Sequence, residues 1–330
     1  GTWSDVNNNI VSNLFDPSTM SSGVYTYTVP GLSPCPSNSA NLTVNVNPLP
    51  TASISTTTPT ICNGNVGSLN FNLTGTAPFD ITYNDGTSNS TQTINTLTGS
   101  VVVTPSTSTT YTLISIIDGN GCSSLISGNV TITVTPGGNA GTNGSISVCE
   151  NSAIFDLFTQ LNGTPDVGGS WTDGSSNPIS NIFNPATFSP GNYTLTYTIN
   201  NPPCIPVTAD VDVTINPIVD AGSNGVHTVC ENDAVFNLFN YLNGSPDPGG
   251  TWTDINNIPV PNMFNPSTSG SGTFTYTYTV LGASPCIDAS ADVTITVDPL
   301  PTVTIGGSTT ITQGMNTPLN FNFTGTAPFN

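Results

Sequence analysis

The stretch Phe274-Thr275-Tyr276-Thr277-Tyr278-Thr279-Val280 alternates aromatic or aliphatic residues with threonine. A second stretch, Asp292-Val293-Thr294-Ile295-Thr296-Val297, alternates in the same way. Alternation with one apolar and one polar face is typical of half-buried antiparallel strands. The two stretches therefore predict strands of a β-sheet and indicate an all-β fold.

This pattern belongs to a repeat of about 81 residues. Residues 147–217 align almost residue for residue with residues 228–299, and Trp171 and Trp252 are 81 positions apart. Residues 1–48 carry the second half of the same pattern, beginning at Trp3. Self-similarity at a fixed period is the signature of a repeat architecture. We name this pattern the type A repeat.

A different pattern, the type B repeat, lies between the type A repeats. Its marker, Leu69–Phe79, recurs as Leu319–Phe329. The sequence thus predicts tandem immunoglobulin-like β-sandwich domains and reads as part of a longer array. The predicted order is the C-terminal half of a type A domain at 1–48, type B at 49–136, type A at 137–217 and at 218–299, and the start of a second type B domain at 300–330.

One segment of the type A repeat breaks the strand pattern. Ile154, Leu157, Phe158 and Leu161 fall at i, i+3, i+4 and i+7, and the equivalent residues of 235–242 repeat this spacing. Such spacing predicts one apolar face of a short helix over the sandwich. The expected N-caps are Asn151 or Ser152 in one repeat and Asn232 or Asp233 in the next, with Asn-Gly as the stop signal. A buried irregular strand is the alternative.

The composition excludes several functions. The chain has no Lys or Arg and 19 Asp plus Glu, so its formal net charge is -19. Nucleic-acid binding depends on cationic side chains that neutralise phosphates, and lysine-based covalent catalysis needs an amine. An anionic membrane surface repels such a chain, and no run of about 20 apolar residues could span a bilayer. We therefore expect neither a nucleic-acid partner nor membrane insertion.

The seven cysteines predict structural disulfides. Domains of about 80 residues bury a modest core, and covalent bridges commonly compensate for it. Bridges also imply an oxidising compartment. Cys35 is expected to be unpaired in this chain, with its partner upstream of residue 1. The expected pairs each lie within one repeat, namely Cys62 with Cys122, Cys149 with Cys204, and Cys230 with Cys286.

None of the residues that could serve in catalysis or metal binding indicates an active site. His227 is the single histidine, and Ile146 replaces it in the preceding repeat. Asp210, Asp212 and Asp292 alternate outward as a solvated face, while Glu150 and Glu231 each follow a cysteine and are expected to be structural. Asp220 and Asp298 lie near domain junctions, where calcium binding is an open alternative to no cofactor, although no Asp-x-Asp-x-Asp-Gly loop is present. The sequence therefore predicts a non-enzymatic protein.

The three tryptophans occupy one position of the type A repeat. Trp3, Trp171 and Trp252 could present a flat surface to a carbohydrate. Recurrence in every repeat favours core packing instead. The order Cys149…Trp171…Cys204 is that of immunoglobulin domains, although the tryptophan comes later after the first cysteine.

Several motifs resemble those of a known family. They are Val-Cys-Glu-Asn, Gly-Gly-Thr-Trp-Thr-Asp at 249–254, Phe-Asn-Pro, the late Pro285-Cys286, and the Leu-Pro-Thr opening of type B. They resemble the immunoglobulin/PKD-like repeats of giant surface proteins of the Bacteroidota, including gliding-motility adhesins of the SprB kind. The resemblance implies type IX secretion, anchoring at the bacterial cell surface, and filaments that carry adhesive function elsewhere.

The sequence and the resemblance together predict a stalk. The expected function is a non-catalytic segment of a secreted cell-surface adhesin, which meets an extracellular surface or polysaccharide through other parts of the parent protein. One alternative is a spacer in a secreted multidomain hydrolase. Another is a self-associating extracellular filament or surface-layer subunit.

Overall fold

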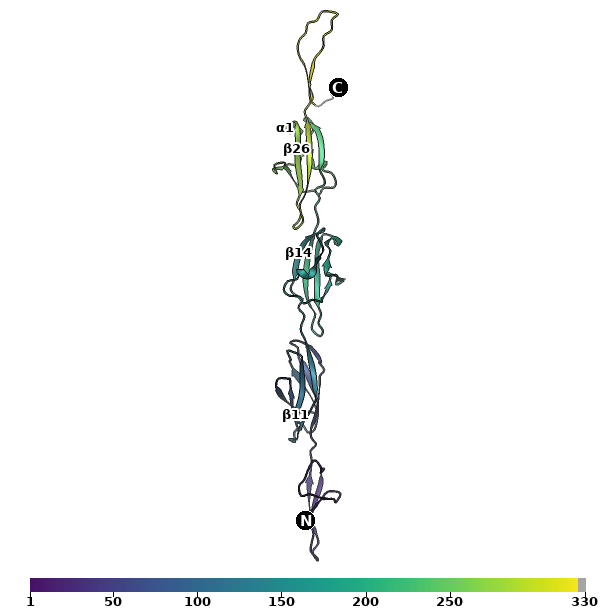
Figure 1. The fold of residues 1–330 in the computed structure, drawn as a ribbon, viewed down its shortest axis with the longest axis vertical. Helices are drawn as coiled ribbons and strands as arrows, with labels where there is room; N and C mark the ends of the chain where they lie inside the picture. The colour runs from purple at the N-terminus through teal and green to yellow at the C-terminus, as the bar shows by residue number, and fades with distance from the viewer. Residues whose placement is uncertain (326–330) are drawn as a thin grey trace. The chain divides into compact units, whose positions relative to one another are not determined.

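The computed structural model describes residues 1–325 and is almost entirely β-structure (Figure 1). The last part of the second type B marker, residues 326–329, lies outside the described residues. The chain forms two compact units, residues 1–138 with 200–206, and residues 139–199 with 207–330. Within residues 1–325, no helix is long and apolar enough to cross a membrane.

The N-terminal part of the first unit is one four-stranded sheet. Its order is β2-β1-β3-β4, and all its pairs are antiparallel. Trp3 pairs with Tyr27 across two strands, with ring centroids 5.2 Å apart. The strands are β1 (Thr2–Ser4), β2 (Ile10–Val11), β3 (Gly23–Val29) and β4 (Asn38–Val44).

The type B region of the first unit is a two-layered sandwich. One sheet has the order β10-β7-β5, and the other has the order β6-β13-β11-β8-β9 with β12 beside β11. Leu69, Phe71 and Ile132 are at most 1% exposed in the core between them. The strands are β5 (Thr51–Ser55), β6 (Thr60–Cys62), β7 (Gly67–Thr74), β8 (Phe79–Asn84), β9 (Asn89–Ile94), β10 (Thr98–Val103), β11 (Thr109–Ile117), β12 (Ser123–Leu125) and β13 (Asn129–Thr135).

The first type A region of the second unit has a five-stranded sheet of order β14-β20-β19-β16-β17, faced by the pair β15-β18. Its strands are β14 (Gly144–Cys149), β15 (Phe155–Asp156), β16 (Ser170–Thr172), β17 (Pro178–Ile179), β18 (Ile182–Phe183), β19 (Gly191–Ile199) and β20 (Val207–Asn216). The short helical segments are η1 (Leu157–Gln160) and η2 (Pro185–Thr187).

The second type A region repeats this arrangement as β21-β27-β26-β23-β24 with the pair β22-β25. Its elements are β21 (Gly225–Cys230), β22 (Phe236–Asn237), η3 (Leu238–Tyr241), β23 (Thr251–Asp254), β24 (Pro259–Val260), β25 (Met263–Phe264), α1 (Pro266–Ser269), β26 (Gly272–Val280) and β27 (Ala289–Asp298). In this region β21 pairs parallel with β27, and in the type B sandwich β6 pairs parallel with β13; β27 and β13 are the last strands of their repeats along the chain.

The two strands expected at the end of type A are confirmed. β26 and β27 pair antiparallel, and Phe274 lies opposite Ile295. Tyr278 is 1% exposed and Val293 is fully buried, whereas the threonines that alternate with such core residues along both strands, for example Thr277 and Thr294, are only partly buried. Alternation thus gives each strand a face toward the core.

The predicted helix is a single 3-10 turn, shorter than the apolar spacing indicated. Asp156, and neither Asn151 nor Ser152, is its N-cap, since its carboxylate accepts a hydrogen bond from Phe158 N–H at 2.9 Å. The preceding residues cannot join the helix because Phe155 pairs with Phe183 as a strand. Ile154 is consequently 62% exposed, although Leu157 is fully buried.

Two of the expected helix caps, Ser152 and Asp233, instead form hydrogen bonds in the turns that follow β14 and β21. The Ser152 hydroxyl accepts from Cys149 N–H, and the Asp233 carboxylate accepts from Cys230 N–H, both at 2.9 Å. In the second repeat Asn237 is the N-cap of η3, so Asn232 and Asp233 were also wrong as helix caps. Strand pairing has overridden the local helical preference.

Residues 300–325 form only a hairpin. β28 (Thr302–Ile305) pairs antiparallel with β29 (Phe321–Thr324). All residues of both strands are exposed. In the described residues no second sheet covers them.

Candidate functional site

The cysteines give the chain its most distinctive connections, and their pairing differs from the prediction. Cys62 is bonded to Cys204, and Cys149 is bonded to Cys286. Cys35, Cys122 and Cys230 are free within residues 1–325. The expected bridges within each repeat, Cys62–Cys122, Cys149–Cys204 and Cys230–Cys286, are therefore wrong.

The physical reason is that β14 and β20, the first and the last strand of the type A repeat, pair parallel to each other. In register, Cys149 lies opposite Asn216 at the end of β20, whereas Cys204 precedes the start of that strand. A ten-residue strand spans roughly 30 Å. Disulfides need Cα atoms about 4.4–6.8 Å apart. The two cysteines of one type A repeat therefore lie at opposite ends of its sheet and cannot meet.

Each bridge instead joins the loop of one repeat to the strand end of the repeat before it. Cys204, in the segment that belongs to the first compact unit, has its sulfur 3.5 Å from Thr135 O, and Thr135 lies opposite Cys62 in register. The sulfur of Cys286 lies 3.7 Å from Asn216 O. Both loop cysteines thus lie over the end of a last strand.

The junction around Cys149 and Cys286 also has a polar contact. The Asn216 side-chain amide donates to Ser284 O at 3.0 Å. Cys149 is 6% exposed and Cys286 is 8% exposed, so the bridge is buried. Two disulfides of this kind indicate an oxidising, extracytoplasmic environment.

The loops that carry these cysteines share one turn. Cys286 N–H donates to Ala283 O at 2.8 Å, and Cys204 N–H donates to Asn201 O at 2.9 Å. In each loop a cis proline precedes the cysteine. The neck of the loop is narrow, because a Cβ at Gly282 would lie 2.6 Å from Ile287 O. The turn presents the cysteine at the tip of the hairpin.

The type B loop is organised by a residue that the sequence analysis missed, Asp118. This carboxylate is 5% exposed and accepts hydrogen bonds from the backbone N–H groups of Cys122, Asn120 and Thr76, at 3.0–3.2 Å. A buried carboxylate needs such donors in a chain without cations. The Asp-Gly-Asn-Gly sequence of 118–121 signals a turn, but not the burial of its aspartate.

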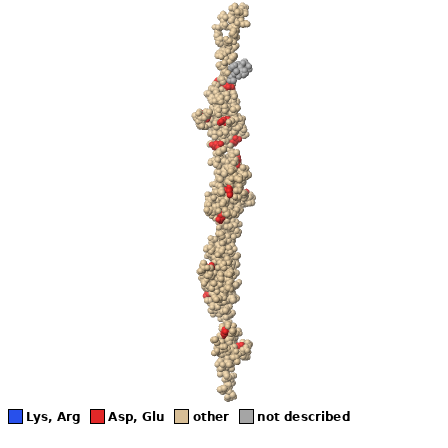
Figure 2. Space-filling view, viewed as in Figure 1, with Lys and Arg blue, Asp and Glu red and all other residues tan. Residues whose placement is uncertain are grey.

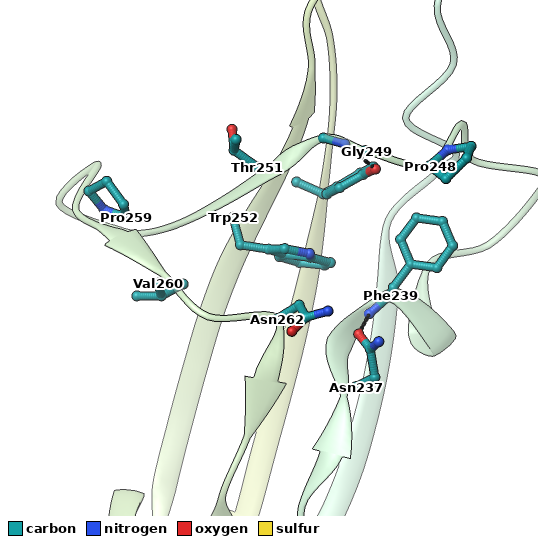
Figure 3. A pocket seen from close by; sticks show the side chains of 11 residues that line it. Asn237, Phe239, Pro248, Gly249, Thr251, Trp252, Pro259, Val260 and Asn262 are labelled. Carbon is teal, nitrogen blue, oxygen red and sulfur yellow. Dashed lines mark hydrogen bonds between the residues drawn. The ribbon is translucent and has the colours of Figure 1, made fainter.

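The tryptophans line a cleft that recurs in both complete type A repeats. The cleft beside Trp252 has a volume of about 540 Å³, and the cleft beside Trp171 has a volume of about 430 Å³. Figure 3 shows Trp252 in the centre of its cleft, beside Asn262 and Phe239. Both volumes lie in the range of ligand sites.

The tryptophan rings nevertheless serve the core. Trp171 and Trp252 are each 5% exposed and belong to the buried clusters of their repeats, which confirms core packing for these two. Trp252 packs on Tyr278 with ring centroids 5.1 Å apart. Trp3 is only half-buried. A 5% exposed ring offers little surface to a sugar.

The cleft does not keep a carboxylate from one repeat to the next; the titratable side chain common to both clefts is a buried tyrosine, Tyr197 in the first and Tyr278 in the second. Asp156 lines the first cleft and accepts from the Asn181 side-chain amide at 3.1 Å. Its equivalent in the second cleft is Asn237, whose side chain accepts from Phe239 N–H at 3.0 Å (Figure 3). The amide keeps the cap and cannot act as a general acid or base. This position of the type A repeat therefore requires a side chain that caps the helical turn, and does not require a carboxylate.

The single histidine packs between aromatic rings. His227 stacks on Tyr241 with centroids 3.9 Å apart and meets Phe236 edge-on at 5.3 Å. In the preceding repeat Ile146 and Gln160 replace His227 and Tyr241. The imidazole thus exchanges with an aliphatic side chain that packs against the core.

The strand carboxylates are satisfied by threonine hydroxyls. Asp212 accepts from Thr194 Oγ1 at 2.6 Å, and Asp210 accepts from Thr196 Oγ1 at 2.8 Å. Asp292 is bonded to a threonine in the same way. Figure 2 shows the carboxylates scattered over the visible face, with no Lys or Arg beside them. Cross-strand threonines provide hydrogen-bond donors where other proteins use cations.

Of the two junction carboxylates, Asp220 is bonded within the protein. The Asp220 side chain accepts from Gly222 N–H at 2.7 Å, and its backbone N–H donates to Asp247 Oδ2 at 2.9 Å. Asp298 lies opposite Cys230 at the end of β27. Within residues 1–325, no three His, Cys, Asp or Glu side chains form a group that could hold a metal ion. The absence of a cofactor stays a prediction, with junctional calcium as its open alternative.

Comparison with known proteins identifies the domain type. The profile of an immunoglobulin-like domain family, described as nucleoporin pom152-like, matches residues 46–120. No curated protein matches the chain.

Several solved structures are similar to the chain. The I67–I69 I-band fragment of titin has a TM-score of 0.44 and 14% identity, and the match covers 75% of this chain and 98% of the fragment. The four N-terminal immunoglobulin domains of a Dscam1 isoform have a TM-score of 0.31 and 12% identity over 90% of each chain. A Ca²⁺-stabilised adhesin of an Antarctic bacterium has a TM-score of 0.34 and 15% identity, covering 79% of this chain and 78% of the adhesin's.

Scores and identities this low do not indicate a function. The sheets and the domain match agree on the fold. The chain is a tandem series of immunoglobulin-like β-sandwich domains, of which one type carries a short extra helical turn.

Proposed function

We propose that this chain is a non-catalytic stalk segment of a large secreted bacterial cell-surface adhesin. The observation that carries the proposal is the pair of bridges between successive repeats, Cys62–Cys204 and Cys149–Cys286. A repeat protein that holds another domain at a distance needs connections that survive force. The bridges themselves supply no catalytic group.

The two bridges interlock in the sequence. Cys149 lies inside the segment that the first bridge closes, and Cys204 lies inside the segment that the second bridge closes. Cys62 and Cys286 are 224 positions apart along the backbone. Through both bridges only the 55 positions between Cys149 and Cys204 remain in the shortest covalent path. Force applied to the two ends of the chain therefore bypasses most of the backbone between Cys62 and Cys286.

The surface chemistry supports the same role. With no Lys or Arg and a net charge of -19, copies of the chain repel one another and repel anionic cell envelopes. The carboxylates of Asp210, Asp212 and Asp292 are bonded to threonines of their own repeat. The clefts beside Trp171 and Trp252 share no carboxylate, and the tyrosine that recurs in them, Tyr197 or Tyr278, is buried with its hydroxyl bonded to a backbone carbonyl. These features suit a segment that separates functional parts.

Single-molecule stretching of the 330-residue chain tests whether the junctions resist force. An extended backbone spans at most roughly 3.3–3.6 Å per residue. The bridges should therefore shorten the maximal extension by about 560–610 Å relative to the chain in reductant. Bridges confined within single repeats would remove nearly the same length, so a second variant is needed.

The discriminating variant is Cys149→Ser with Cys286→Ser. The remaining bridge, Cys62–Cys204, has a sequence separation of 142 and should still remove about 470–510 Å. A remaining bridge between Cys62 and Cys122 would remove only about 200 Å. The smaller value, or no difference between oxidised and reduced chains, contradicts the force-transmitting role.

The cell-surface location has its own test. Immunogold electron microscopy of intact cells, with an antibody against residues 149–299, should label thin fibres that project from the surface. Label confined to the culture supernatant would refute the anchored stalk and would favour a spacer in a secreted enzyme.

A further inference from the structure

The seven cysteines occupy only two places in the fold. The first place is the last residue of the strand that pairs parallel with the final strand of its repeat, and we name its occupants early cysteines. The second place is the loop that follows the strand paired antiparallel with the final strand, and we name its occupants loop cysteines. The early cysteines are Cys62, Cys149 and Cys230. The loop cysteines are Cys35, Cys122, Cys204 and Cys286.

The two bridges follow one rule. Cys204 of a type A repeat is bonded to Cys62 of the type B repeat before it. Cys286 of the next type A repeat is bonded to Cys149 of the repeat before it. In both bridges, a loop cysteine is joined to the early cysteine of the preceding repeat. The preceding repeat is of type B in the first bridge and of type A in the second, so the rule holds for both types of preceding repeat.

Cys230 has the surroundings of Cys149 but no partner within residues 1–325. Cys149 lies opposite Asn216 at the end of its last strand, and Cys230 lies opposite Asp298 in the same register. The N–H of each cysteine is bonded to the side chain three residues on. Cys149 is 6% exposed because Cys286 and its loop cover it, whereas Cys230 is exposed.

The free loop cysteines are held in position as well. Cys35 N–H donates to Leu32 O at 2.7 Å, as the bonded Cys286 does to Ala283 O, and both follow a cis proline. Cys122 N–H is bonded to the Asp118 carboxylate. Neither thiol has a partner among residues 1–325.

We infer that Cys230 is the attachment site for the loop cysteine of the type B repeat that begins at residue 300. The hairpin at 302–324 repeats the β5–β7 pairing of the first type B repeat, with Thr302 opposite Thr324 as Thr51 is opposite Thr74. The loop cysteine of that first repeat is Cys122. The partner of Cys230 is therefore the equivalent of Cys122 in a complete second type B repeat.

By the same rule, Cys35 and Cys122 would each pair with a cysteine at the early place of a preceding repeat; residues 1–61 contain no early cysteine. Formation of each bridge removes two thiol protons and two electrons and joins the two sulfurs. The electrons pass to an oxidised dithiol catalyst, which leaves as the dithiol. Thr312 occupies the place of Cys62 in the second type B repeat, so that repeat offers no early cysteine.

A chain that completes the second type B repeat tests the inference. Residues 81–136 are appended after Asn330, so that the copied Cys122 is supplied in its own loop. In the unextended chain, maleimide should label Cys230. In the extended chain, folded in a glutathione redox buffer, Cys230 should resist labelling, and peptic peptides analysed without reduction should contain Cys230 bonded to the copied cysteine. Pepsin is used because trypsin has no Lys or Arg to cleave after.

Two further chains complete the design. Replacing the copied cysteine by serine should restore labelling of Cys230, while Cys62–Cys204 and Cys149–Cys286 persist as a check of folding. In the second chain, residues 300–330 are replaced by a copy of residues 218–299, which should bond Cys230 to the copied Cys286. This arrangement repeats the junction that joins Cys149 and Cys286.

The labelling and peptide results distinguish failure of the whole inference from failure of the type B assignment alone. A reactive Cys230 in both extended chains, or a bond between Cys230 and Cys286 of its own repeat, overturns the inference. A bond in the type A extension alone overturns the assignment of the type B loop as the partner. Neither outcome depends on whether the protein is a surface stalk, because the readout is the bond itself.

Discussion

The type B marker occurs twice in this chain, once inside a complete sandwich and once in a lone hairpin. Leu69, Phe71 and Leu73 are at most 5% exposed, whereas their equivalents are 47–68% exposed. Those equivalents are Leu319, Phe321 and Phe323. The same alternation produces a strand paired in the same register in both places. Alternation therefore determines the strand and its partner, but burial requires the facing sheet formed by β6, β13, β11, β8 and β9.

The largest expected difference between the copies comes from the core phenylalanine. Phe71→Ala should destabilise the type B sandwich by about 3–5 kcal/mol, because Phe71 is 1% exposed and its removal leaves a cavity. The matched change Phe321→Ala should alter stability by no more than about 0.5 kcal/mol. Hydrogen exchange of the β7 and β29 amides, read by mass spectrometry, measures both. Equal effects would mean that Phe71 is not core.

A smaller difference is expected where the two copies differ in sequence. Thr317 in the second copy occupies the place of Gly67. A Cβ at Gly67 would lie 2.8 Å from Ile132 Cδ1. Gly67→Thr should therefore destabilise the sandwich by about 1–3 kcal/mol through overpacking. The reverse change, Thr317→Gly, should have little effect, and slowed exchange in Gly67→Thr would refute the steric argument.

The two copies should behave alike at one exposed pair. Thr51 and Thr74 are bonded through their hydroxyls at 2.6 Å, and Thr302 and Thr324 form the same pair. Thr51→Val and Thr302→Val should each cost about 0.5–1 kcal/mol, the net value of one hydrogen bond. Hydrogen exchange at β5 and β28 checks this equality. A large cost in one copy alone would show that the pair contributes through burial.

The smallest expected effect appears only at acidic pH and only in the complete type B repeat. Asp85 follows β8, and hydrogen bonds from Ser88 N–H and then Thr87 lower the pKa of its carboxyl to about 2, from an ordinary value of 3.8. A lowered pKa stabilises the folded state above the ordinary value, and this contribution is lost as the pH falls from about 4 through about 2. NMR titration of the Asp85 carboxyl should give the low midpoint, and Asp85→Asn should remove this acid dependence. A midpoint near the ordinary value would show that the turn is not formed.

The sequence by itself determined the repeats, the strand alternation and the all-β class, because each is a local pattern. It also determined the exclusion of cation-dependent chemistry, because that follows from residue types alone. Tertiary structure decided what depends on partners far apart in the chain. Pairing of Phe155 with Phe183 reduced the predicted helix to one turn. Parallel pairing of the first strand with the last placed the two cysteines of a repeat at opposite ends of a sheet. The number and positions of the cysteines are written in the sequence, but which sulfurs meet depends on the direction in which a strand is paired.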